Sequence, residues 1–101
     1  MKTVLIVDDN LKNLDLFKDF VESWGYVTIT AQQGKDAICF AEQYLPDIIL
    51  LDVMLPGMSG YEVCRELKEN PKTQHIPVVM ITVLNDIADR IHGYKIGADQ
   101  F

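Results

Sequence analysis

The chain has 101 residues, of which 49% are hydrophobic and 24% charged, a composition typical of one globular domain rather than of a disordered segment. Its formal net charge of −6 argues against direct binding to nucleic acid and against binding to an anionic membrane surface. The apolar run at residues 4–7 is too short for a signal peptide or a membrane span, so we expect a cytoplasmic protein with Cys39 and Cys64 reduced and mostly buried.

Short apolar runs alternate along the chain with segments whose apolar residues recur every three or four positions. The runs at residues 4–7, 26–31, 48–51 and 77–82 predict strands. The segments at residues 10–24, 35–44 and 60–69 predict helices, and Trp24 falls on the apolar side of the first. A fourth helix is predicted to begin at residue 85 or 86 and to end at Gly97.

This alternation predicts an α/β fold, in which right-handed βαβ crossovers build a parallel sheet with helices on both faces. The pattern reaches residues 98–101 at the point where a fifth strand would begin. We therefore expect a fragment of a longer chain that lacks the last strand and the last helix. An uncovered fourth strand would then favour self-association.

Acidic residues follow two of the predicted strands. Asp8 and Asp9 follow the first strand, Asp52 follows the third, and Thr82 ends the fourth. Because the carboxyl ends of parallel strands meet at one edge of a sheet, we expect these side chains to lie close together. Three neighbouring carboxylates repel one another, so either one of them takes a proton or they bind a divalent cation such as Mg²⁺. A carboxylate beside a metal ion and a hydroxyl is also a competent acceptor for a phosphoryl group.

Taken one at a time, these residues have simpler explanations. Asp9 or Asn10 could cap the first predicted helix, and Thr82 could be an ordinary hydroxyl at the end of a strand. Their grouping at one sheet edge favours a functional site. His75 and His92 are not placed to meet the acids, so we expect both to be exposed.

Four motifs resemble the receiver domain of two-component response regulators over all 101 residues: VLIVDDN (4–10), PDIILLDVMLPGMSG (46–60), IPVVMIT (76–82) and GADQF (97–101). The resemblance implies a flavodoxin-like, doubly wound parallel sheet with strand order 2-1-3-4-5. It also implies that Asp52 takes a phosphoryl group from a phosphohistidine on a sensor histidine kinase or phosphotransfer protein. Asp8, Asp9, Asp52 and the backbone carbonyl of Met54 would hold Mg²⁺, with Mn²⁺ as a substitute.

The same resemblance assigns residues around the phosphoryl group. Thr82 and Phe101 would form the switch that reports phosphorylation, and Met54, Leu55 and Val83 would surround the phosphoryl site. The lysine that the family carries at the end of its fifth strand would lie beyond Phe101. The receiver would control an output domain or an effector protein, and residues 89–101 are most similar to receivers with cyclic-dinucleotide output.

Two other functions are consistent with parts of the pattern. A phosphatase with an aspartyl nucleophile would need a second Asp two residues after the first, and this chain has Met54 there. A receiver-like interaction module that works without phosphorylation would have no need for all of Asp8, Asp9, Asp52 and Thr82, but the lysine that lies outside this chain leaves that alternative open. We expect a domain that accepts and slowly loses its own phosphoryl group, and not an enzyme that turns over an external substrate.

Overall fold

The computed structural model describes residues 2–81. Strands and helices alternate in the order β1 (Thr3–Val7), α1 (Leu11–Ser23), β2 (Val27–Ala31), α2 (Gly34–Tyr44), β3 (Ile48–Asp52), α3 (Gly60–Glu69) and β4 (Val78–Ile81). Each of these boundaries lies within one residue of the predicted one. The helix predicted to end at Gly97 and the start of a fifth strand at residues 98–101 lie outside the described residues.

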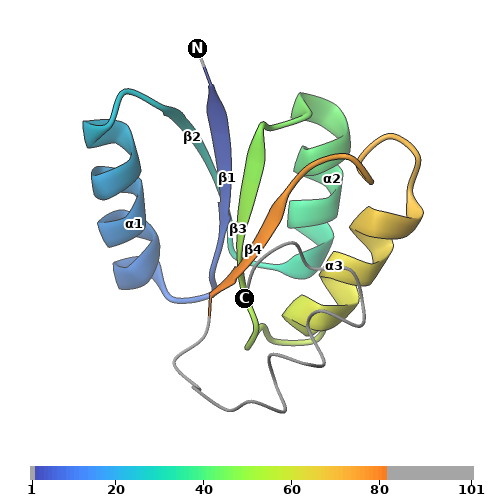
Figure 1. Ribbon diagram of the computed structural model, residues 1–101. Helices are drawn as coiled ribbons and strands as arrows, with labels where there is room; N and C mark the ends of the chain where they lie inside the picture. Colours follow the sequence, from blue (N-terminus) through green and yellow to red (C-terminus); the bar gives the residue numbers. More distant parts are fainter. Residues whose placement is uncertain (1, 82–101) are drawn as a thin grey trace.

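The four strands form one parallel sheet in the order β2-β1-β3-β4. This is the order that the resemblance implied for these strands, and it makes β1 and β3 neighbours in the middle of the sheet (Figure 1). Their register pairs Val7 with Leu51, and the register of β3 with β4 pairs Asp52 with Ile81. Strands β1 and β3 therefore end side by side. Asp8 and Asp9, which follow β1, lie at the same sheet edge as Asp52.

Helices cover both faces of the sheet. Helix α1 lies on one face, and helices α2 and α3 lie on the other (Figure 1). The larger core lies under α2 and α3, where Leu5 and Leu51 are fully buried. A smaller core on the opposite face joins Ile6 to Leu14 and Val21 of α1. Strand β1 buries side chains on both faces, whereas β3 buries one face fully and the other partly, which fits the uninterrupted apolar runs in both sequences.

Two expectations about single side chains are wrong. Trp24 does not pack on the apolar side of the first helix, because α1 ends one residue earlier and Trp24 is its C-cap, with 68% of its surface exposed. Cys39 is exposed, because α2 buries the side on which Ala37 and Ala41 lie. Cys64 is buried as expected.

Candidate functional site

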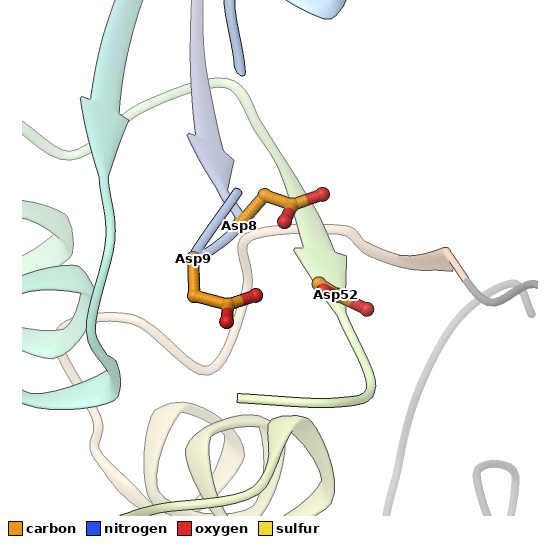
Figure 2. Close-up of side chains that lie close together, drawn as sticks. All are labelled: Asp8, Asp9 and Asp52. Atoms are coloured by element: carbon orange, nitrogen blue, oxygen red, sulfur yellow. The ribbon is translucent and has the colours of Figure 1, made fainter. Parts of the chain in front are cut away.

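Three carboxylates gather at the end of β1 and β3. Asp8 and Asp9 come directly after β1, and Asp52 is the last residue of β3. One carboxylate oxygen from each lies within 4.8 Å of the others. Figure 2 shows the three side chains beside one another, two from the end of β1 and one from the end of β3. The sequence-based prediction that these residues meet at one sheet edge is confirmed.

Asp8 and Asp9 are neighbours in sequence but differ in their surroundings. The backbone N–H of Asp8 donates to the carbonyl oxygen of Ala31 at 3.1 Å, so Asp8 still belongs to the sheet and is only 4% exposed. Asp9 lies where the chain leaves the sheet, and it is exposed. Asp8 therefore brings a buried carboxylate to the cluster, whereas Asp9 brings one that solvent reaches.

The start of α1 holds the carboxylate of Asp8 through two hydrogen bonds. The backbone N–H of Asn10 donates to Oδ1 at 2.9 Å, and the side-chain amide of Asn13 donates to Oδ2 at 3.3 Å. Asn10 also caps α1, as its position in the sequence allowed, since its side chain accepts from the N–H groups of Lys12 and Asn13. The contact of Asn13 was not predicted. Its only sequence signal is its position three residues after a helix cap.

Asp52 is partly buried, and its surroundings disfavour the ionised form. The pKa of its carboxyl rises from 3.8 to about 6. Burial is the largest cause, and the negative charges of Asp8 and Asp9 and a hydrogen bond with Asp8 raise the pKa further. The backbone N–H of Met54, which donates to Asp52 Oδ1 at 3.1 Å, acts in the opposite direction. The sequence predicted that one of the three acids takes a proton or that they bind a divalent cation. Either outcome would reduce the negative charge that raises the pKa of Asp52.

The loop between β3 and α3 fixes the position of Asp52. The N–H of Gly60 donates to the carbonyl oxygen of Val53 at 2.9 Å. A Cβ atom at Gly60 would collide with the backbone carbonyl of Asp52, so only glycine allows the start of α3 to lie this close to the end of β3. A cleft of about 510 Å³ opens beside this loop and is lined by Asp9, Val53, Met54, Leu55, Pro56 and Ser59.

The remaining predicted site residues are placed as follows. Met54 is 63% exposed at the cleft, whereas the side chain of Leu55 is 8% exposed and packs in the larger core. Thr82, Val83 and Phe101 lie outside the described residues, and so does His92. His75 is exposed in the turn before β4, as expected.

The donor set of this cluster suits a hard divalent cation. Carboxylate oxygens are the ligands that Mg²⁺ and Mn²⁺ prefer in proteins, and three of them lie within reach of one ion here. A cation would also offset the repulsion between the three acids. The residues present therefore fit divalent metal binding.

Comparison with known proteins points in the same direction. The chain matches the family model of the response regulator receiver domain over residues 4–101. It is 49% identical over 98 residues to the response regulator PleD of Caulobacter vibrioides, covering 97% of this chain and 22% of PleD. It is 44% identical over 81 residues to the polar-differentiation response regulator DivK of Brucella anthropi, covering 80% of this chain and 66% of DivK. This chain therefore spans only part of the length of these relatives.

Solved structures share the fold closely. The N-terminal domain of a response regulator receiver protein from Methanoculleus marisnigri JR1 matches with a TM-score of 0.91 at 32% identity, over 99% of this chain and 81% of that one. The Mn²⁺-bound response regulator Rcp1 matches with a TM-score of 0.88 at 30% identity, over 99% and 78%. The receiver domain of the sensor histidine kinase PA1611 from Pseudomonas aeruginosa PAO1, with magnesium in its active site cleft, matches with 0.90 at 27% identity, over 98% and 81%.

Proposed function

This chain belongs to the response regulator receiver domain family, and from that premise we propose that it is the phosphoacceptor signalling domain of a two-component response regulator. In this proposal Asp52 takes a phosphoryl group, and the change alters the surface that controls an output domain or an effector protein. The observation that carries the proposal is the position of Asp52 at the end of a buried strand, with its carboxylate within 4.8 Å of those of Asp8 and Asp9.

The proposed reaction depends on Mg²⁺, for which Mn²⁺ can substitute. Asp8, Asp9 and Asp52 would hold the ion together with the backbone carbonyl of Met54. When bound, the ion supplies positive charge that reduces the repulsion between the negatively charged phosphoryl group and the three carboxylates. The magnesium and manganese ions held by two proteins of the same fold support this assignment.

The residues of this chain supply the nucleophile and its orientation. A carboxylate oxygen of Asp52 attacks the phosphorus of a phosphohistidine, a new P–O bond forms, and the P–N bond breaks. The leaving imidazole keeps the electron pair and takes up a proton from solvent. A pKa of about 6 leaves Asp52 mostly ionised at neutral pH, and partial burial makes its oxygen less solvated than a surface carboxylate. The N–H of Met54 fixes the rotation of the carboxylate by holding Oδ1.

Partners and location extend this proposal. The phosphodonor would be a sensor histidine kinase or a phosphotransfer protein, and the output would be a domain or effector related to cyclic dinucleotides. Thr82 and Phe101 would relay phosphorylation to that output. We propose a cytoplasmic domain that does not turn over an external substrate. Separately, the longest helix described within residues 2–81 has 13 residues, fewer than the roughly 20 that a membrane span needs.

Acetyl phosphate tests the proposed function. The protein is incubated with it in MgCl₂ or in EDTA, and the intact mass is followed over time for wild type, Asp52→Asn and Asp19→Asn. Asp19 is exposed on α1, so Asp19→Asn removes one carboxylate outside the acid cluster. Wild type and Asp19→Asn should gain one phosphoryl group in Mg²⁺ and none in EDTA, and Asp52→Asn should gain none. A folded wild type that neither gains mass nor releases phosphate would support an interaction module, and fast release of phosphate without accumulation of phosphorylated protein would indicate a hydrolase.

A further inference from the structure

One residue outside the acid cluster contacts it directly. Asn13 lies in the first turn of α1, and its amide nitrogen Nδ2 donates to Asp8 Oδ2 at 3.3 Å. The N–H of Asn10 donates to Oδ1 of the same carboxylate at 2.9 Å. Asp8 is almost fully buried, so each of its oxygens accepts one hydrogen bond from the start of α1 while the carboxylate faces the cluster.

The amide of Asn13 is not used to cap its helix. Asn13 is the third residue of α1, where a side chain commonly bonds back to the N–H of the cap residue. Here the cap is Asn10, and its N–H is already donated to Asp8. The side chain of Asn13 reaches the same carboxylate instead. Its hydrogen bond therefore serves the acid cluster and not the helix end.

We propose that Asn13 is a positioning residue for the divalent cation, holding Asp8 where its carboxylate faces those of Asp9 and Asp52. A carboxylate oxygen has two lone pairs, so an oxygen that accepts one hydrogen bond keeps a second lone pair for a cation. Hydrogen bonds of this kind orient metal ligands, and their removal typically weakens metal binding about 10- to 100-fold. This inference rests on the proposed function, because it takes the three acids as the cation site.

The chemistry of the side chain favours this role for an amide. Asn13 gives Asp8 a hydrogen-bond donor without adding charge to the cluster. A lysine in its place would donate too, but its positive charge would repel the cation. A carboxylate would add a fourth negative charge and leave Asp8 Oδ2 without this donor.

Magnesium titrations of the whole chain test the proposal without any phosphodonor. The dissociation constant is measured from the amide NMR signals of the loop after Asp52, for wild type and for Asn13→Leu, Asn13→Ala and Asn13→Gln. Gln33→Leu is the matched control, because Gln33 is an exposed amide at the start of α2 whose side chain makes no capping hydrogen bond. Unfolding by urea is recorded with and without Mg²⁺, since a residue with only a structural role changes stability equally in both conditions.

Asn13→Leu and Asn13→Ala should each raise the dissociation constant about tenfold, the lower end of the range for such contacts because the hydrogen bond is long. Asn13→Gln keeps the amide and should stay within about threefold of wild type, and Gln33→Leu within about twofold. If wild type binds Mg²⁺ and both Asn13→Leu and Asn13→Ala bind it equally well, the positioning role is wrong and the proposed function stands. If wild type itself shows no saturable site, the proposed function fails, and this inference with it.

Discussion

Replacing Asp52 by Asn should stabilise the metal-free protein at neutral pH. The wild-type carboxyl ionises with a pKa of about 6 in the folded chain, against an ordinary value of 3.8. Ionised Asp52 is partly removed from water and lies beside two other acids, whereas Asn carries no charge. In the wild type the N–H of Met54 donates to Asp52 Oδ1, and the side-chain oxygen of the asparagine in the variant can accept the same hydrogen bond. The proposed phosphoacceptor therefore lowers the stability of the apo fold.

The magnitude follows from the raised pKa. A shift of about 2 pKa units corresponds to roughly 3 kcal/mol, and partial exposure of Asp52 to solvent reduces this to about 1 to 2 kcal/mol. The folded protein holds the proton more tightly than the unfolded chain, so this stabilising effect is complete below pH 3.8 and is lost as the pH rises through about 6. The difference between Asp52→Asn and wild type should therefore be small near pH 4 and full at pH 7.5.

Urea unfolding in EDTA at pH 4 and at pH 7.5 measures this difference. Asp19→Asn serves as the control, and we expect its free energy of unfolding to stay within about 0.5 kcal/mol of wild type at both values. Addition of MgCl₂ at pH 7.5 should stabilise wild type more than Asp52→Asn, because the variant lacks one of the proposed ligands. Equal stability of Asp52→Asn and wild type at pH 7.5 in EDTA would refute this electrostatic reasoning.

Three other substitutions test the site. Asp9→Ala should remove most Mg²⁺ binding, and an unchanged dissociation constant in a calorimetric titration would exclude Asp9 as a ligand. Gly60→Ala should lower the free energy of unfolding by about 1 to 3 kcal/mol and weaken Mg²⁺ binding, because its Cβ meets the backbone of Asp52. Gly57→Ala is the control: its site is open but its φ is +78°, so urea unfolding should show a loss of about 1 kcal/mol with Mg²⁺ binding intact. Thr82→Ala should still accept a phosphoryl group but should lose the NMR shifts that phosphorylation causes in residues 87–95. Shifts of equal size in Thr82→Ala and wild type would contradict the role of Thr82 in the switch.

Much of the fold could be predicted because the local and long-range signals agree. The run of aliphatic residues before Asp52 has no helical period, and it forms a central strand that is buried on one face and partly buried on the other. Asn10 and Gly25 mark the two ends of the first helix, as a cap and as a residue with φ of +91°. The meeting of the acids follows from parallel strands, whose carboxyl ends share one sheet edge.

The parts that could not be predicted depend on geometry that no local pattern encodes. Asp8 and Asp9 occupy the same kind of sequence context, and only the register of the sheet decides that the first is buried. The contact of Asn13 with Asp8 depends on how α1 sits against the end of β1. Helix α2 buries the small residues Gly34, Ala37 and Ala41, and Cys39 lies on its exposed side. The positions of large apolar side chains in the sequence therefore do not identify the packed side of this helix.

The central claim is that Asp52 carries the phosphoryl group. Protein treated with acetyl phosphate and MgCl₂ is reduced with borohydride, which converts an aspartyl phosphate into homoserine, and peptide mass spectrometry then locates the converted residue. We predict homoserine at position 52 and at no other position, and its complete absence when EDTA replaces MgCl₂. Homoserine at position 8 or 9, or a stable phosphate on Ser59 or His75 with Asp52 unmodified, would contradict the account.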